Sequence, residues 1–362
     1  MNATSPVEAI PETPYRAPAA PAGATDQPLA HLGSSGGPAD FLLIGGGFFG
    51  YAREISALLE RQGRKVLWFD DRPALDTLTK AAVRLAPRVI ARKLEAFVTR
   101  IVERARAESI REVLVIKGEA LSPAALRRLR AALPRARFTL YFWDSYLNMP
   151  KDSPEKVAIF DRAFSFDPED TARDQRLRYR PLFFLDEYNN LPTLEQDIDL
   201  LFFGTAHGDR YPVLRRLARS LPAGIRFEMV LYFPSKAIYG IRRVLDPRLW
   251  SASRDEFIFT PLSRAEIRRL VARTRAVVDI ERPIQTGFTM RSVETLGAGR
   301  KLVTTNPSVL KADFYNPDNM VVIDRQRPAI PARLFERPYV APPTDIMRRY
   351  SLSGWVGEVL AE

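Results

Sequence analysis

The chain has 362 residues, of which 46% are hydrophobic, and its formal net charge is +11 at pH 7. This length predicts two domains, and the charge favours anionic partners such as nucleotides or acidic lipids, although no motif points to nucleic acid. The absence of cysteine excludes disulfides and thiolate metal sites, and with only His31 and His207 as histidines we expect neither a metal centre nor a bound cofactor.

The amino-terminal part of the chain carries no signal of regular structure. Residues 1–40 are rich in Pro and Ala without periodicity, and we expect them to be a disordered tail. They contain no secretory leader, and no run of about 18 apolar residues that would span a membrane occurs in the chain. We therefore expect a cytoplasmic protein, with a peripheral place at the inner membrane as an alternative.

Residues 41–71 predict a strand, a glycine-rich turn, a helix and a second strand. Gly45, Gly47 and Gly50 form a Gly-x-Gly-x-x-Gly pattern, and Asp70 stands about 20 residues further on, where a dinucleotide site places a ribose-binding acid. The alternative that follows is an NAD(P)-dependent oxidoreductase. We rank it second, because two bulky phenylalanines lie inside the pattern and a lone fingerprint is a frequent false positive.

Residues 73–108 are helical in pattern and strongly basic. Lys80, Arg84, Arg88 and Arg92 recur every four residues and would form one stripe, and Pro87 should kink or split the helix. Such a stripe favours peripheral contact with an anionic membrane or with a lipid-linked phosphate. The more ordinary interpretation is a solvated helix face packed on a sheet.

Two further strands are predicted at residues 112–116 and 138–142, separated by a helix over 123–133. Lys117 and Glu119 follow the first of these strands, and Asp144 follows the second. Ligands of open parallel sheets bind beyond the carboxyl ends of the strands, so Asp144 is a candidate general base. A turn or helix-capping aspartate is the alternative interpretation.

The second half begins near residue 197 with another strand, turn and helix. Its turn holds Gly204, Thr205, His207 and Arg210; the histidine could exchange a proton, donate to a phosphate, or simply be a polar turn residue. A strand over 225–233 and a basic, irregular segment over 235–250 follow. Ser263 and Glu266 predict a capping box at the start of the next helix.

Residues 276–306 predict a strand, a polar loop, a helix over 288–296 and a second strand. A helix start with Gly287 before it would suit a phosphate, because its backbone N–H groups are unpaired and its dipole is positive there. Thr286 and Thr289 can add hydroxyl donors and Arg291 a forked cation. Glu294, one turn further on, could accept both hydroxyls of a ribose.

This stretch resembles the donor-binding segment of GT-B glycosyltransferases, and most of all the bacterial polysaccharide and spore-maturation-type enzymes. The pattern Gly-Phe-Thr-x-Arg-x-x-Glu-x-Leu-Gly at 287–297, the Lys-Leu-x-Thr-Thr-Asn strand at 301–306 and the Asp-Phe-Tyr-Asn-Pro turn at 313–317 carry the resemblance. It implies that Glu294 holds the ribose of a nucleotide sugar and that the helix start holds the diphosphate. Many retaining members have an acid eight positions before this glutamate; here that position is Thr286, and the nearest acid upstream is Glu281.

The resemblance implies an α/β protein with two Rossmann-like domains. We expect an acceptor domain over 41–190, a donor domain over 197–335, and a final helix over 340–362 that crosses back to the first domain. Cations are expected to stabilise the leaving diphosphate without a metal, with Arg210, Arg291 and Lys301 as candidates. The residues expected to bind the donor are Gly204, Thr205, Arg210, Gln285, Thr286, Gly287, Phe288, Thr289, Arg291 and Glu294, and the catalytic candidates are Asp144 and His207.

The expected activity is transfer of a sugar from a nucleotide-activated donor to a glycan or lipid-linked acceptor in cell-surface polysaccharide synthesis. The remaining alternatives are the oxidoreductase built on Gly45–Gly50 and a GT-B-like protein that binds ligands without catalysis.

Overall fold

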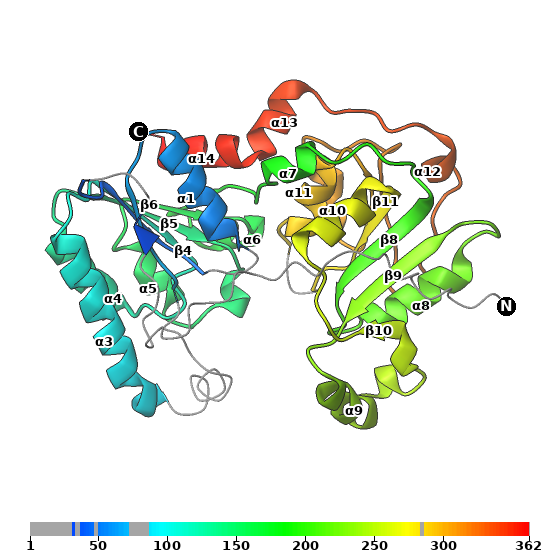
Figure 1. Ribbon diagram of the computed structural model, residues 1–362, viewed down its shortest axis with the longest axis horizontal. Coiled ribbons are helices and arrows are strands. Elements are labelled where there is room, and N and C mark those ends of the chain that lie inside the picture. The colour runs from blue at the N-terminus through cyan, green and yellow to red at the C-terminus, as the bar shows by residue number, and fades with distance from the viewer. Residues whose placement is uncertain (1–30, 33–36, 47–49, 72–86, 283–285, 362) are drawn as a thin grey trace.

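The computed structural model describes residues 31–32, 37–46, 50–71, 87–282 and 286–361. Within them, two sheets lie side by side, with the first on the left and the second on the right in Figure 1. Every strand runs parallel to its neighbours except β1, and helices pack on both faces of each sheet. The predicted α/β class with two Rossmann-like halves is confirmed.

The strands of the first sheet follow the order β1-β3-β2-β4-β5-β6-β7. Their bounds are β1 His31–Leu32, β2 Phe41–Ile44, β3 Val66–Phe69, β4 Glu112–Ile116, β5 Arg137–Phe142, β6 Arg162–Ser165 and β7 Leu177–Tyr179. β1 lies inside the segment expected to be disordered and pairs antiparallel with β3 at the sheet edge. Two residues are too short to leave a periodic pattern, and residues 1–30 lie outside the described chain.

Side chains of the central strands alternate between two cores because successive residues of a strand point to opposite faces. In β2, Phe41 and Leu43 join one core, whereas Leu42 and Ile44 join the other. The helices of this half are α1 Tyr51–Arg61, α3 Pro87–Arg106, α4 Pro123–Ala132, α5 Ser153–Val157, α6 Pro168–Arg173 and the single turn η2 Tyr146–Asn148. Of the basic stripe predicted over 73–108, Lys80 and Arg84 lie outside the described residues, whereas Arg88 and Arg92 belong to α3, which begins at Pro87.

The second sheet has the strand order β10-β9-β8-β11-β12-β13 in the described residues. Its strands are β8 Ile198–Thr205, β9 Phe227–Tyr232, β10 Phe257–Ile258, β11 Thr274–Asp279, β12 Lys301–Thr304 and β13 Met320–Val322. Because all of them are parallel, their carboxyl ends share one edge of the sheet.

The helices after the first sheet are α7 Asp186–Asn189, α8 Arg210–Ser220, α9 Lys236–Leu245, α10 Arg264–Ala272, α11 Met290–Gly297, α12 Arg333–Glu336, α13 Thr344–Tyr350 and α14 Leu352–Leu360, with turns η3 Pro247–Leu249, η4 Arg254–Glu256 and η5 Pro307–Lys311. The predicted capping box of Ser263 and Glu266 is present at α10. The prediction of an irregular segment over 235–250 is wrong. The Ser235 hydroxyl accepts the Ile238 N–H, and this cap starts α9.

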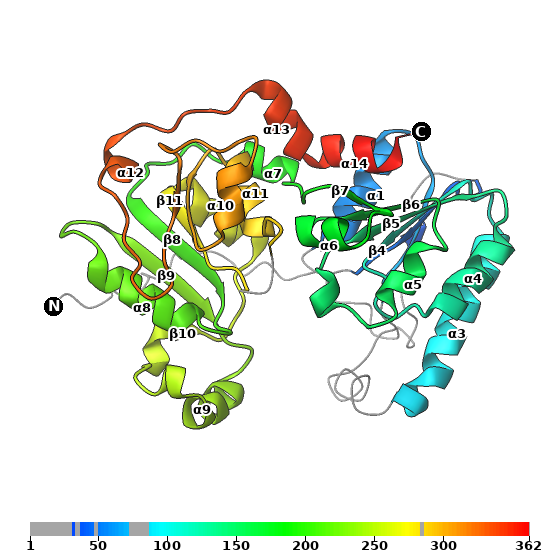
Figure 2. The ribbon, with the colours of Figure 1, turned by 180° about the vertical axis from the view of Figure 1, so that it is seen from behind.

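The two halves share one apolar core. Leu114 of the first sheet, Val277 of the second and Val293 of α11 belong to a single buried cluster, which also contains Trp355 of α14. After α12 the chain returns along the top of the molecule, and α14 lies next to α1 in the first half (Figures 1 and 2). Trp355 packs there with its ring centroid 4.7 Å from that of Tyr141. None of the described helices is at once long and apolar enough to cross a membrane.

Candidate functional site

The candidate site lies at the carboxyl edge of the second sheet, where it faces the first half. The ends of β8 and β11 bring Thr205 and Asp279 to this edge, and the segment after β11 leads into α11. Ligands of parallel sheets bind at such an edge because loops and helix starts converge there.

The start of α11 is held by side chains from its own half. Thr289 is the N-cap, and its hydroxyl accepts the Ser292 N–H at 3.1 Å while donating to Asp279 at 2.7 Å. The Ser292 hydroxyl donates to the same carboxylate at 2.9 Å. The hydroxyl of Thr289 thus fixes the helix to β11, whereas we expected it to donate to a phosphate.

The loop before α11 is bound to the first half. The Thr286 N–H donates to Asp167 at 3.2 Å, and the Thr286 hydroxyl donates to the same carboxylate. A Cβ on Gly287 would lie 2.6 Å from both the ring and the carbonyl oxygen of Phe166. A glycine is therefore needed here because the first half approaches closely, a different reason from the ligand contact that we expected.

One other predicted donor residue does not face an open site in the described structure. Phe288 is buried and packs edge-on against Phe314, with ring centroids 5.2 Å apart, so it is a core residue. Gln285 lies outside the described residues.

Glu294 lies at the junction of the two halves and is only 5% exposed. The hydroxyl of Tyr51, the first residue of α1, donates to one carboxylate oxygen, and Arg291 Nη1 contacts the other at 3.2 Å. The Tyr188 hydroxyl of α7 lies close to this carboxylate as well. Burial raises the pKa of Glu294, and the cation and the two hydroxyls oppose that rise. This carboxylate therefore already accepts one hydroxyl from the first half and has a second hydroxyl, from α7, close to it.

Two arginines flank the same edge. The guanidinium of Arg291 stacks on Phe203, with Cζ 3.2 Å from the ring centroid. Arg210 donates from Nε to the Ile280 carbonyl at 2.9 Å and from Nη1 to the Thr205 carbonyl at 3.2 Å. A guanidinium has five N–H donors, so these bonds orient Arg210 between β8 and β11 and leave donors for an anion. The arrangement suits a ligand with a polyol on one side and an anionic group on the other.

Comparison with known proteins gives matches at the level of structure. No protein-family model and no curated protein matches the sequence. A glycosyltransferase from Rickettsia africae aligns with a TM-score of 0.56 and 11% identity over 90% of this chain and 99% of that one. HepE from Anabaena, solved with UDP-glucose, has a TM-score of 0.53 and 13% identity over 91% and 98% of the two chains. A UDP-GlcNAc 2-epimerase from Methanocaldococcus jannaschii has a TM-score of 0.50 and 8% identity over 89% and 98%.

The chain has the GT-B fold. The likeness concerns the arrangement of the two halves, and identities this low carry no information on the reaction. Glu294, Arg291 and Arg210 belong to the second half, and the Tyr51 hydroxyl reaches Glu294 from the start of α1 in the first half.

His207 follows β8 at the same edge. Partial burial and the positive fields of Arg210, Arg282 and Arg242 lower the pKa of His207 from 6.5 to about 4. The imidazole is therefore neutral at pH 7. It can donate one N–H to a phosphate oxygen or accept a proton, but it does not supply a positive charge there.

We expect His207 to make the folded state sensitive to mild acid. Between pH 6.5 and 4 the unfolded chain binds a proton at this histidine that the folded chain does not, so stability falls as the pH is lowered through this window. Thermal unfolding at intervals from pH 7 to pH 4.5 should show a smaller loss of Tm for His207→Asn than for the wild type. Parallel curves for the two proteins would contradict the lowered pKa.

Asp144 lies at the carboxyl edge of the first sheet, and its carboxylate pairs with Lys117 Nζ at 2.6 Å. The same ammonium lies 3.3 Å from Glu119. The neighbouring Trp143 ring packs 5.4 Å from that of Tyr51, which in turn contacts Glu294. Asp144 is thus placed in a charged cluster on the side of the first half that carries Tyr51.

Two charged residues singled out in the sequence bind other groups of the protein instead of facing the candidate site. The expectation that Lys301 stabilises a diphosphate is wrong: it begins β12 at the opposite edge, and its buried ammonium donates to the carbonyls of Leu334 and Arg337. The carboxylate of Glu281 is buried, pairs with Arg325 at 2.7 Å and accepts the Thr305 hydroxyl. Within the described residues, no cluster of three metal-binding side chains occurs.

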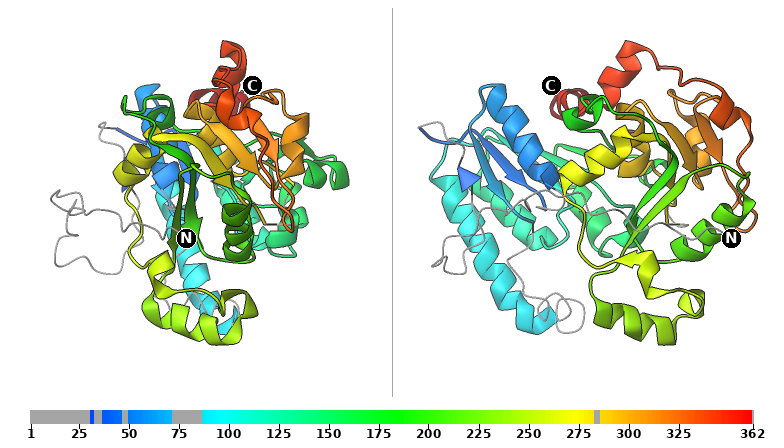
Figure 3. Two further views of the ribbon diagram at one scale, coloured as in Figure 1. Left: turned by 90° about the vertical axis from the view of Figure 1, so that its right-hand side faces the viewer. Right: turned by 45° about the vertical axis from the view of Figure 1, so that its right-hand side comes forward.

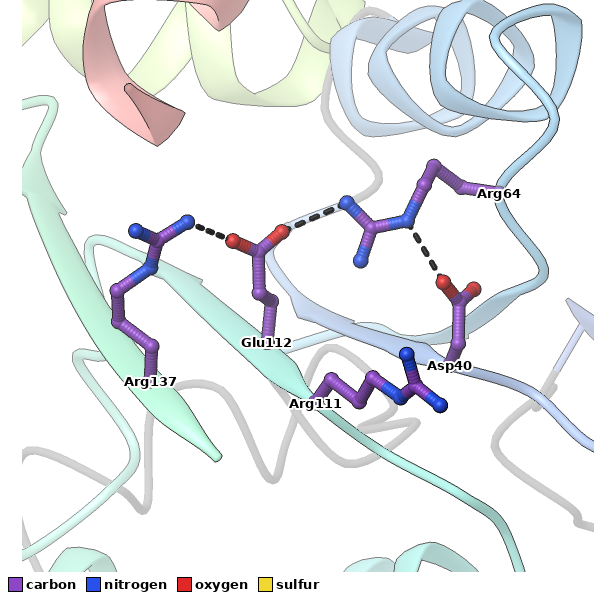
Figure 4. A pocket seen from close by; sticks show the side chains of 5 residues that line it. All are labelled: Asp40, Arg64, Arg111, Glu112 and Arg137. Carbon is purple, nitrogen blue, oxygen red and sulfur yellow. Dashed lines mark hydrogen bonds and ion pairs between the residues drawn. The ribbon is translucent and has the colours of Figure 1, made fainter. Parts of the chain in front are cut away.

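A separate cavity of about 530 Å³ opens at the amino ends of β2, β4 and β5 (Figure 4). It is lined by Asp40, Arg64, Arg111, Glu112 and Arg137. Arg64 bridges Asp40 and Glu112 at 2.7 Å each, and Arg137 also pairs with Glu112. We assign it no reaction, because these carboxylates are neutralised by their neighbours and the cavity lies at the opposite edge from Glu294.

Sequence reasoning missed the side chains that connect the two halves. Tyr51 follows Gly50, which has a left-handed φ of 77° and turns the chain into α1. Tyr188 lies in a short helix between the two sheets. Neither residue belongs to a motif. The role of each becomes clear only from its position next to Glu294 at the junction of the two halves.

Proposed function

We propose that the protein is a glycosyltransferase that uses a nucleotide-activated sugar. The observation that carries this proposal is the Glu294 carboxylate, which lies with Arg291 at the junction of the two halves, accepts the Tyr51 hydroxyl and has the Tyr188 hydroxyl close to it. A ribose offers two neighbouring hydroxyls, which match these donors in chemistry. Arg291 and Arg210 then lie where a diphosphate would follow.

Bond cleavage in such a donor releases a nucleoside diphosphate, whose growing negative charge needs stabilisation. We infer that the free donors of Arg210 and Arg291, with the neutral imidazole of His207, supply it. Asp144 of the first half is the proposed base for an acceptor hydroxyl, since it follows β5 at the carboxyl edge of the first sheet, beside the Trp143 ring that packs on Tyr51. The acceptor is proposed to be a glycan or a lipid-linked sugar in cell-surface polysaccharide synthesis, bound by residues 41–190.

Tyr51 is proposed to compete with the ribose for Glu294, because both offer a hydroxyl to the same oxygens. Tyr51→Phe removes this donor and keeps the ring that packs on Trp143. We expect the variant to bind a nucleoside diphosphate about three to ten times more tightly, the equivalent of one net hydrogen bond. Titration calorimetry measures the change, and an unchanged or weaker affinity would show that Tyr51 does not compete.

A binding panel tests the proposed function. Purified protein is heated with UDP, GDP, ADP and CMP, with their common sugar conjugates, and with NAD and NADP. A ligand that binds only the folded state at a hundred times its Kd stabilises it by about 2.7 kcal/mol, which is readily seen as a rise in Tm. Stabilisation by one nucleoside diphosphate supports the proposal and identifies the base. Stabilisation by NAD alone, lost in Asp70→Ala, would overturn it.

A further inference from the structure

Helix α9 exposes an apolar face to solvent. Four large aliphatic side chains on it are exposed, Ile238 by 42%, Ile241 by 60%, Val244 by 74% and Leu245 by 76%. At 3.6 residues per turn these positions fall within an arc of about 120°. Soluble proteins expose single apolar residues commonly, but a continuous row of this kind marks an interaction surface.

The opposite side of α9 explains why this face points outward. Tyr239 is buried and packs against Phe233, Phe257 and Phe259, with ring centroids 5.2 to 6.0 Å away. Its hydroxyl donates to the Ala252 carbonyl at 3.0 Å. The helix is therefore fixed to the second half by one side, and its aliphatic row stays outside the core.

Trp250 extends the same surface beyond the end of the helix. Its side chain is 62% exposed, and its indole N–H donates to the Val244 carbonyl at 3.4 Å. Tryptophan prefers the boundary between water and lipid, because its ring is apolar and its N–H is polar.

Basic side chains accompany the apolar row: Arg242 borders it, whereas Lys236 and Arg243 lie toward the side of the helix that carries Tyr239. Residues 236–250 contain Lys236, Arg242, Arg243 and Arg248 against a single acid, Asp246, which gives four positive charges minus one, or +3. Asp246 pairs with Arg248 at 2.8 Å. An apolar helix face with a net positive charge beside it matches a bilayer surface, which is negatively charged at the headgroups and apolar just beneath them.

We propose that α9 and Trp250 dock the protein on an anionic lipid bilayer. The aliphatic row would enter the boundary between headgroups and acyl chains, while the basic side chains contact the headgroups. The net positive charge beside the apolar row complements an anionic bilayer, and we commit to lipid as the occupant on this ground. This surface differs from the basic stripe expected over residues 73–108.

The surface formed by α9 and Trp250 lies on the same side of the second sheet as the candidate site. α9 follows β9 at the carboxyl edge of the second sheet, and the field of Arg242 reaches His207. In Figures 1 to 3, α9 and the amino end of α3 both extend toward the lower end of the molecule. Docking through α9 would therefore hold the bilayer near the rim of the candidate site, although the proposal does not depend on the reaction catalysed there.

Vesicle flotation of the full chain tests the proposal. We expect the wild type to float with phosphatidylglycerol–phosphatidylcholine vesicles, to stay behind with pure phosphatidylcholine, and to release in high salt. Ile241→Ser with Leu245→Ser should reduce partition at least about tenfold, because two exposed aliphatic groups are lost. Lys236→Glu should also reduce it. Leu310→Ser, a change at an aliphatic residue on η5 that is 49% exposed, is the matched control and should bind like the wild type.

Brominated acyl chains give a second measurement. They should quench the fluorescence of bound wild-type protein but scarcely that of Trp250→Phe, because Trp68 and Trp355 are buried and Trp143 packs half-buried against the core of the first half. Failure of the wild type to bind anionic vesicles, or undiminished binding by the double variant, would overturn the proposal. So would a wild-type dimer that the double variant converts to monomer, since α9 would then cover a second copy. Nucleotide binding measured on the same variants reports on the proposed function separately.

Discussion

Glu294→Gln is expected to lower the affinity for a nucleoside diphosphate by about ten- to a hundredfold. A hydrogen bond to a charged acceptor contributes about 1.5–3 kcal/mol, and the amide removes the negative charge and leaves one accepting oxygen for the two ribose hydroxyls. The substitution keeps the shape of a side chain that is buried among Tyr51, Tyr188 and Arg291. Titration calorimetry with the nucleotide identified in the binding panel measures the effect.

The control for this prediction is Glu336→Gln, which removes an exposed carboxylate from α12 in the same half of the molecule. It should leave the affinity unchanged. If Glu294→Gln also bound the nucleotide as tightly as the wild type, the carboxylate would serve only to join α11 to α1 and α7, and its proposed contact with the ribose would be wrong.

Gly287→Ala is expected to destabilise the protein by about 1–3 kcal/mol, the range for overpacking a tight contact. The new methyl group would lie 2.6 Å from the carbonyl oxygen of Phe166, which no rotation of the Phe166 side chain can relieve. The loop must then move away from the first half. Each kcal/mol corresponds to about 2–4 °C in Tm for a domain of 150–250 residues, which differential scanning calorimetry resolves.

Gly357→Ala is the matched substitution in α14, where a Cβ would meet nothing within 4 Å. Alanine is favoured over glycine in a helix by up to about 1 kcal/mol, so this variant should be unchanged or slightly more stable. Equal Tm values for the two alanine variants would show that the loop at Gly287 yields without cost. The close approach of Phe166 would then not be the reason for the glycine.

The strands, helices and caps that were predicted correctly depend on residues close together in the sequence. The strand at 112–116 coincides with β4, since a short apolar run bounded by polar residues has few other ways to bury itself. The helix expected over 288–296 is α11, and Ser263 caps α10, because capping depends on residues three positions apart. The sequence pattern does not predict α9, whose apolar positions face solvent instead of a core.

By itself, the sequence determined most of the longer strands and helices apart from α9, the capping box of α10 and the presence of Glu294 near a helix start. These follow from spacings of a few residues, over which backbone hydrogen bonds and side-chain periodicity act. Only the tertiary structure decided that Tyr51 contacts Glu294 from 243 positions away and that Gly287 meets Phe166. It also decided that Lys301 lies at the wrong edge. Such contacts depend on how two sheets pack against each other, which no local pattern encodes.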